Sequence, residues 1–201
     1  NTLQYLSDDS AILSSRETSS IIKINNLSTN PSIGYIIGNE DFWKNTDYTE
    51  YLYTKEGDFL TSGGQHTVTY MEDDSLESGQ YYLYMFDNNF GYSKTRKDYD
   101  WTVNEGIQTS ILEGMTSYYY QYLVDENEGT YTLVKSFEVP FSAYVSSAQN
   151  LGDHIVVDSG IAGLLSIYDA GGNLEQQFSI KKNDRFIYRI YYYDYKGYYF
   201  S

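Results

Sequence analysis

Short segments rich in β-branched and aromatic residues recur along this chain, and residues typical of turns separate them. The first such segments are residues 11–15, 19–24 and 32–37, with Asn25-Asn26 and Asn30-Pro31 between them. Segments of this length and composition favour β-strands, because branched and ring side chains pack well on a pleated surface. One helical turn is expected around Trp43, and no long helical pattern follows it. The chain is therefore predicted to be all-β.

Two hairpins are predicted in the middle of the sequence. Residues 66–71 and 80–86 flank an acidic loop, and residues 117–124 and 130–139 flank a second polar turn. Residues 81–86 read Tyr-Tyr-Leu-Tyr-Met-Phe and are apolar on both faces, which is typical of a buried central strand. Residues 48–59 give a weaker strand signal, and residues 92–113 are predicted to form a long loop.

The last third of the chain has the most regular pattern. Strands are predicted at residues 144–150, 154–158, 164–168, 174–180, 185–193 and 197–200. Such spacing suits a sandwich, a barrel or a propeller, and the run over residues 154–180 has the cadence of a propeller blade. The whole chain provides about three four-stranded units, whereas propellers usually close with about four to eight blades. We therefore expect propeller blades with antiparallel, radially arranged sheets, forming one partial domain over residues 1–201.

The sequence opens in mid-pattern at Asn1, without an initiator Met. This start suggests a piece of a longer chain, so a strand edge beside Asn1 should be left for a missing N-terminal polypeptide or for a second copy of the protein. An uncovered edge of this kind invites pairing with another chain.

Charge and composition exclude several function classes. The net charge is −15, which argues against nucleic acid or an anionic membrane surface as a partner, since both require a basic surface. Cysteine is absent, so disulfides and Cys-ligated metals are excluded, and no apolar run approaches the length of a membrane span. The 25 Tyr residues argue for a folded chain. An acidic, tyrosine-rich chain without cysteine would suit an exported bacterial protein.

His66 and Arg16 are the candidate reactive residues, although each also has a simpler interpretation. His66 follows Gly63-Gly64 and enters a predicted strand, a position from which an imidazole can face a cleft; it could equally be a satisfied turn histidine. Arg16 ends a predicted strand and could bind an oxyanion, or it could form a surface pair with Glu17. Taken singly, the simpler interpretations are favoured. His154 is predicted to lie on the outer surface.

No common catalytic or cofactor motif is present. The chain lacks phosphate-binding, dinucleotide-binding, nucleophile-elbow and zinc-protease patterns. The acidic stretches at residues 87–89 and 98–100 could touch a cation but lack the spacing of a calcium loop, so a solvated loop is the preferred interpretation. We expect neither a cofactor nor a metal.

An ordered set of short motifs resembles the bacterial aryl-sulfate sulfotransferases. The motifs are Ser14-Ser15-Arg16-Glu17-Thr18, Ile21-Ile22-Lys23-Ile24, Ile36-Ile37-Gly38, Gly64-Gln65-His66, Phe86-Asp87-Asn88-Asn89, Val139-Pro140-Phe141-Ser142, Ser146-Ser147, Val156-Val157-Asp158-Ser159-Gly160 and Tyr188-Arg189. Each motif is short, but they span nearly the whole chain in the family's order.

The resemblance implies a six-bladed propeller that transfers a sulfuryl group from a phenolic sulfate to another phenol without the nucleotide sulfate donor. His66 matches the histidine that becomes transiently sulfated, and Arg16 matches the arginine that holds the sulfuryl oxygens. Asn88 and Ser146 match further motif positions and are weaker candidates for substrate binding. A periplasmic, extracellular or cell-surface location is implied. Neutral imidazole suits this role because it is a nucleophile near neutral pH and a good leaving group once sulfated.

The chain departs from the family's pattern in lacking the active-site histidines expected upstream of the Ser-Ser-Arg motif. The upstream blades and the small N-terminal domain are also absent, so the resemblance covers only the C-terminal part of the enzyme. Two alternatives stay open: a non-enzymatic, tyrosine-rich propeller-like binding or surface module, and a paralogue that keeps the fold without catalysis.

Overall fold

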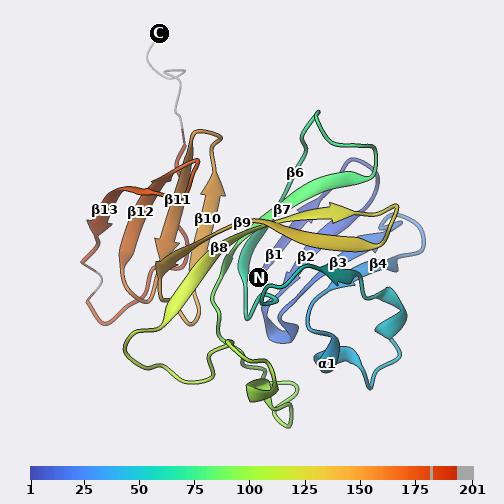
Figure 1. Cartoon of the computed structure of the whole chain (residues 1–201), viewed down its shortest axis with the longest axis horizontal. Coiled ribbons are helices and arrows are strands. Elements are labelled where there is room, and N and C mark those ends of the chain that lie inside the picture. Colours follow the sequence, from blue (N-terminus) through green and yellow to red (C-terminus); the bar gives the residue numbers. More distant parts are fainter. Residues whose placement is uncertain (182, 194–201) are drawn as a thin grey trace.

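The computed structural model describes residues 1–181 and 183–193 and contains three β-sheets, shown side by side in Figure 1. The first sheet is an antiparallel meander in chain order. Its strands are β1 (Thr2–Tyr5), β2 (Ala11–Ser15), β3 (Ser20–Asn25) and β4 (Ser32–Ile37). Short turns join these strands, as the Asn-rich connections in the sequence predict.

The central sheet has the strand order β5-β9-β8-β7-β6. Its bounds are β5 (Thr54–Glu56), β6 (His66–Met71), β7 (Gln80–Asp87), β8 (Thr116–Asp125) and β9 (Thr130–Pro140). Strands β6 to β9 form an antiparallel meander, whereas the short β5 pairs with β9 in parallel. The prediction of purely antiparallel four-stranded sheets is therefore wrong for this sheet, because the returning chain adds a fifth strand at its outer edge.

The third sheet is again an antiparallel meander of four strands in chain order. Its strands are β10 (Ser146–Asn150), β11 (His154–Ser159), β12 (Leu164–Asp169) and β13 (Leu174–Ser179). The turn after β12 is closed by the Asp169 carboxylate, which accepts the Asn173 backbone N–H at 2.8 Å. This turn lies within residues 154–180, the run whose cadence in the sequence is that of a propeller blade.

Helical structure is sparse among the described residues. The single α-helix, α1 (Glu40–Trp43), begins where the Asn39 side chain accepts the backbone N–H of Phe42 at 3.3 Å. Three short 3₁₀ turns complete the set: Arg16–Thr18, Thr49–Tyr51 and Trp101–Val103. Within the described part of the chain, no helix has the length and apolar character needed to cross a membrane. The all-β prediction is confirmed.

The three sheets pack face against face, and the first strands of their meanders lie around a common centre. Strand β6 contacts β1 and β2 of the first sheet and β10 of the third, so the first strand of each meander lies toward the same centre. Strand β7 shows the consequence most directly. Tyr81, Leu83 and Met85 pack toward the first sheet, while Tyr84 and Phe86 pack toward the third. The predicted burial of β7 on both faces is thus explained by a sheet on either side.

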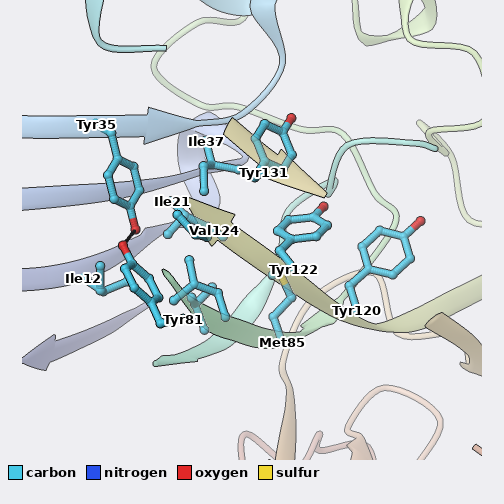
Figure 2. Close-up of a cluster of buried hydrophobic side chains, with 12 residues drawn as sticks. Ile12, Ile21, Tyr35, Ile37, Tyr81, Met85, Tyr120, Tyr122, Val124 and Tyr131 are labelled. Atoms are coloured by element: carbon cyan, nitrogen blue, oxygen red, sulfur yellow. Dashed lines mark hydrogen bonds between the residues drawn. The ribbon is translucent and has the colours of Figure 1, made fainter. Parts of the chain in front are cut away.

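Tyrosines fill much of the core between the first two sheets (Figure 2). Tyr35 is fully buried, and its hydroxyl forms a hydrogen bond of 2.7 Å with the hydroxyl of Tyr81. The Tyr81 hydroxyl also reaches the Glu126 carboxylate at 2.7 Å, which in turn binds Lys23 at 2.6 Å. Buried hydroxyls cost free energy unless they are hydrogen-bonded. This network explains how a tyrosine-rich sequence can form a packed interior.

The predicted strand at residues 185–193 is wrong. Residues 185–193 form no strand ladder, and side chains of β10 bond to their backbone groups instead. Ser147 and Gln149 bond to the backbone of Ile190 and Tyr192, respectively. The last predicted strand, residues 197–200, lies outside the described residues.

The carboxylate of Asp158 on β11 gives a testable pH dependence. Asp158 is fully buried, and neither oxygen has a hydrogen-bond partner within residues 1–181 and 183–193. Burial raises the pKa of this group from 3.8 to about 7. The folded protein therefore holds a proton that the unfolded chain releases, so this group's contribution to stability is full below about pH 4 and is lost as pH rises toward 7.

In the wild type, Asp158 should lower the unfolding free energy by up to roughly 4 kcal/mol between acidic and neutral pH, since one pKa unit corresponds to about 1.4 kcal/mol. We expect Asp158→Asn to abolish this part of the pH dependence. Denaturant unfolding across this pH range measures the effect. Asp87, whose pKa burial also raises to about 7, should leave a residual slope of the same sign. Asp153→Asn, which changes an exposed carboxylate before β11, is the matched control. An unchanged slope in Asp158→Asn would contradict the prediction.

Candidate functional site

His66 is held at the start of β6 by the glycine turn that precedes it. The Gly63 N–H donates to the Asp87 carboxylate at 2.6 Å, and the Gly64 N–H donates to Ser19 Oγ at 2.9 Å. Gly64 has a φ of +68°, and a Cβ there would lie 2.6 Å from the Phe90 carbonyl oxygen. Only glycine fits this conformation without displacing the backbone. The Gly-Gly pair therefore fixes where the imidazole enters the site.

The hydrogen bonds of His66 define its tautomer. Nδ1 lies 2.6 Å from Asn88 Oδ1 and 3.1 Å from the Gly64 carbonyl oxygen. Both of these atoms accept, so Nδ1 carries the proton and donates. The lone pair is then on Nε2, to which no other described residue makes a hydrogen bond. A neutral imidazole in this tautomer presents Nε2 as a nucleophile.

The environment of His66 keeps the ring neutral. Burial lowers the pKa of His66 from 6.5 to about 4, and the hydrogen bonds to Asn88 and Gly64 offset only part of this effect. The nearby positive charge of Arg16 lowers it further. Only 4 % of the residue is exposed, so desolvation of the charged form dominates. Near neutral pH the lone pair is available in essentially every molecule.

Asn88 and Ser146 form the support behind the imidazole. Asn88 Nδ2 donates to the Ser142 carbonyl oxygen at 2.6 Å and to Ser146 Oγ at 3.1 Å, which turns Oδ1 toward His66. Both Asn88 and Ser146 have no exposed surface. The structure therefore brings these two predicted residues to the site but places them behind the ring, where they can orient His66. A substrate would meet other groups.

Arg16 begins the 3₁₀ turn directly after β2, as the sequence predicted for a cation at a strand end. Its Nη1 donates to the Tyr92 carbonyl oxygen at 3.0 Å, and the guanidinium lies 5.5 Å from the centre of the Tyr92 ring. Its Nε is buried and has no hydrogen-bond partner among the described residues. Burial lowers the pKa of Arg16, so the fold places a cation at some cost in free energy beside the Gly64 turn. His66 and Arg16, far apart in the sequence, lie in one site.

The simpler interpretation of Arg16, a surface pair with Glu17, is not what the structure shows. Glu17 turns away and accepts hydrogen bonds from Thr95 N at 2.7 Å, from Ser93 Oγ and Thr95 Oγ1 at 3.1 Å, and from Lys94 N. Although burial acts to raise the pKa of Glu17, these bonds lower it. Glu17 thereby fixes the turn that carries the Tyr92 carbonyl. It is a positioning residue for Arg16.

For the sulfuryl transfer that the sequence resemblance implies, we expect Glu17→Ala to reduce the rate about tenfold, because small displacements of a positioned group reduce catalysis strongly. Glu17→Gln, which keeps an acceptor oxygen, should restore part of the rate. The loss should also disappear in an Arg16→Ala background, which separates positioning from a general structural defect. The control is Glu113→Ala, which changes an exposed residue of the long loop between β7 and β8 that also carries Tyr92. Equal losses with and without Arg16 would refute the positioning role.

Sequence reasoning missed the contribution of the C-terminal segment. The Tyr188 ring lies edge-on to the His66 ring with centroids 6.5 Å apart, and Arg189 Nη2 donates to the Asn1 carbonyl oxygen. The available signal was the Tyr188-Arg189 motif, but a strand prediction gave no reason to place it beside His66. The mapping of these two residues to the site required the structure.

Other candidate sites are not supported by the geometry. His154 is exposed and pairs with Glu175 at 2.9 Å, which agrees with its predicted outer position. The Asp87 carboxylate is used by the Gly63 N–H, and Asp100 caps its own turn through Thr102. Among the described residues, no group of three or more acidic or histidine side chains gathers for a metal. A cavity of about 920 Å³ between α1 and β5 includes neither His66 nor Arg16.

The fold and site define an all-β protein with a neutral, oriented imidazole beside a guanidinium. The sequence model of the Arylsulfotransferase (ASST) family matches residues 1–194. The chain belongs to this family, and the match confirms the resemblance drawn from its motifs. No curated protein sequence matches the chain.

Two solved structures were compared with the chain. One is a candidate 6-phosphogluconolactonase from Bacteroides fragilis, with 14 % identity and a TM-score of 0.49 over 90 % of this chain and 39 % of that one. The other is apo AztD from Citrobacter koseri, with 11 % identity and a TM-score of 0.31 over 90 % of this chain and 47 % of that one. The chain thus spans less than half the length of either.

Proposed function

We propose that this chain carries the central chemistry of an aryl-sulfate sulfotransferase, which moves a sulfuryl group from a phenolic sulfate ester to a phenol without a nucleotide donor. His66 is the nucleophile, and the intermediate is a sulfohistidine. The single observation that carries the proposal is the His66 geometry: a buried neutral ring with its proton fixed on Nδ1 toward Asn88 and its lone pair on Nε2. Family membership supplies the class of reaction.

In the first half-reaction, the Nε2 lone pair attacks the sulfur of the donor. An N–S bond forms, the bond from sulfur to the phenolic oxygen breaks, and the electron pair leaves with that oxygen as a phenolate. The phenolate takes a proton and departs as a phenol. The imidazole now carries positive charge, which the hydrogen bonds from Nδ1 to Asn88 and to the Gly64 carbonyl oxygen stabilise.

In the second half-reaction, the oxygen of the acceptor phenol attacks the same sulfur. The N–S bond breaks, the electron pair returns to Nε2, and the acceptor releases its proton. The sum is an exchange of a phenolic proton for a sulfuryl group, so no redox partner is required. The low pKa of His66 makes Nε2 a competent leaving group because the ring is stable as the neutral form.

Arg16 acts on the sulfuryl oxygens. Negative charge is spread over these oxygens during transfer, and a preorganised cation in a water-poor site stabilises it more than solvent does. The Nε of Arg16 is buried without a partner among the described residues, which leaves a donor for such an oxygen. We further propose that the protein works in the periplasm or outside the cell, where its acidic, cysteine-free chain would be stable.

The test is direct detection of the intermediate. The protein, expressed from its complete coding sequence, is incubated with 4-nitrophenyl sulfate, quenched in base, digested and analysed by mass spectrometry. An acid-labile sulfuryl group is expected on the peptide that carries His66, and addition of a phenol before the quench should discharge it. No adduct and no release of 4-nitrophenol would instead favour a non-catalytic binding module or a paralogue that has lost catalysis.

A further inference from the structure

Two arginines in the surroundings of His66 share an unusual feature. The buried side-chain nitrogens and oxygens that lack a hydrogen-bond partner in the described parts of the chain are few. Two of them are the Nε atoms of Arg16 and Arg189. A buried N–H on a charged group is costly to leave unpaired. An anionic ligand with several acceptor oxygens would satisfy both atoms.

Arg189 is held in a segment that we call the C-terminal strap, residues 187–192. Ser147 Oγ donates to the Ile190 carbonyl oxygen and accepts the Ile190 N–H, both at 3.0 Å. Gln149 does the same for Tyr192, accepting its N–H at 2.7 Å and donating to its carbonyl oxygen at 3.1 Å. These bonds, one residue and three residues after Arg189, fix the position of the strap along β10. Arg189 is therefore placed by the third sheet.

A glycine allows the strap to approach. The Ile187 N–H donates to the Gly160 carbonyl oxygen at 3.3 Å. A Cβ at position 160 would lie 1.9 Å from the Ile187 carbonyl oxygen, a distance that side chains do not tolerate. The same Cβ would lie 2.7 Å from the Val145 carbonyl oxygen, so a larger residue must displace the strap, the connection before β10, or both, while Arg189 itself stays unchanged. Gly160 thus provides a way to move Arg189 without altering its charge.

The strap brings Arg189 to the His66 side of the site. Its Nη2 donates to the Asn1 carbonyl oxygen, while the Asn1 side chain donates to the Gln65 carbonyl oxygen at 2.8 Å, one residue before His66. The Arg189 guanidinium also lies 5.2 Å from the centre of the Tyr188 ring, whose own distance to the His66 ring is 6.5 Å. Arg16 lies in the turn after β2, so the two arginines approach the surroundings of His66 from different parts of the chain.

We propose that Arg189 is a second guanidinium of the anion site, recognising the sulfate group of the donor ester together with Arg16. This proposal rests on the proposed function. A sulfate monoester has three terminal oxygens, so it can accept hydrogen bonds from two guanidiniums at once. Arg189 still has Nε and Nη1 as donors when its Nη2 is bonded to Asn1. Because Arg189 acts on the anion, it should favour the charged donor over the uncharged acceptor phenol.

The experiment measures equilibrium binding as well as rate, using the protein expressed from its complete coding sequence. Binding of 4-nitrophenyl sulfate is measured by calorimetry in a His66→Asn background, where no turnover occurs. Arg189→Gln should weaken this binding between roughly 10- and 100-fold, as expected for loss of a charge-assisted hydrogen bond. Binding of an uncharged phenol should change by less than about twofold. Arg189→Lys should recover only part of the loss because a lysine cannot make the same forked contact.

Two further variants separate the position of Arg189 from its charge. Gly160→Ala should weaken donor binding to a similar extent. Adding Arg189→Gln to Gly160→Ala should weaken it little further, because the contact between Arg189 and the donor is already lost. Arg185→Gln removes an exposed arginine of the neighbouring sequence and should leave donor binding unchanged. Far-ultraviolet circular dichroism and thermal unfolding check that each variant is folded. If Arg189→Gln does not fold, the binding comparison is made with Arg189→Lys.

The proposal is overturned if a folded Arg189→Gln or Arg189→Lys protein binds 4-nitrophenyl sulfate as tightly as its parent. It is also overturned if donor and phenol lose affinity equally, since that would indicate a general structural role. Because binding is measured without turnover, failure of the sulfohistidine mechanism would not hide the result. A donor-specific loss without any His66 adduct would support the anion site and reject the proposed chemistry.

Discussion

His66→Asn is expected to abolish the sulfuryl adduct and to reduce transfer to phenol by at least roughly four orders of magnitude, as for removal of other catalytic nucleophiles. Asparagine is close in size to the inner half of the imidazole and can still bond to Asn88, so the turn at Gly64 should survive. What the variant lacks is the Nε2 lone pair. Release of 4-nitrophenol from 4-nitrophenyl sulfate gives the rate, and mass spectrometry gives the adduct.

The matched control for this prediction is the second histidine. His154→Asn changes an exposed ring paired with Glu175 at the far end of the third sheet, so both adduct and rate should stay at the wild-type level. Full activity in His66→Asn would end the proposed mechanism. An adduct that moves to another residue in His66→Asn would do the same, because it would show that the protein has a different acceptor.

The same ring predicts an unusual pH profile. The nucleophile is the neutral form, which exists above the pKa of His66, and burial lowers that pKa from 6.5 to about 4. The acidic limb of kcat/KM for the donor should therefore fall near pH 4, with full nucleophile at pH 6. An acidic limb close to 6.5 would mean that the ring is solvated in the working protein, contrary to its burial here.

Much of the fold could be predicted because turns and strands are encoded locally. Asn25-Asn26 separates β3 from β4, and the segment Asp169 to Asn173 closes the turn before β13, so the meanders are visible in the sequence. The pattern of Tyr81 to Phe86, apolar on both faces, correctly predicted a strand covered on both sides. These features depend on neighbouring residues or on a strand's own two faces.

The C-terminal strap could not be predicted because its partners are side chains distant in the sequence. The tyrosines and isoleucines of residues 185–193 give the composition of a strand, yet Ser147 and Gln149 take backbone groups that a ladder would use. The pairing of the short β5 could not be predicted for a related reason, since its parallel partner β9 comes only after the three intervening strands β6, β7 and β8. Composition indicates a strand-like segment but does not indicate which residues pair with that segment.

The candidate site was predictable only through its motifs. Local patterns placed His66 after a flexible turn and Arg16 at a strand end, but each residue alone favoured a simpler interpretation. The family resemblance selected this pair, and the fold now brings the two into one site through the Ser19–Gly64 and Tyr92 contacts. The buried support of Asn88 joins the residue after β7 to the connection between β9 and β10 and to the first residue of β10, which no local pattern specifies.

Arg16→Ala is expected to slow sulfuryl transfer by roughly 10²–10³-fold, the loss typical of removing one preorganised oxyanion donor. The charge on the sulfuryl oxygens changes most in the transition state, so kcat should fall together with kcat/KM. The pKa of His66 should also rise, because the Arg16 charge is one of the causes that lower it. The pH profile of the variant therefore carries a second, independent readout.

Arg16→Lys distinguishes the shape of the guanidinium from its charge. A lysine retains the positive charge near His66, so the acidic limb should stay close to that of the wild type. Its donors all lie on one nitrogen, so it cannot reproduce the separate positions of Nη1, which bonds to the Tyr92 carbonyl oxygen, and Nε. We therefore expect a rate between those of the wild type and Arg16→Ala. If Arg16→Ala reacts at the wild-type rate, Arg16 does not contact the reacting group, and its unpaired Nε then requires another explanation.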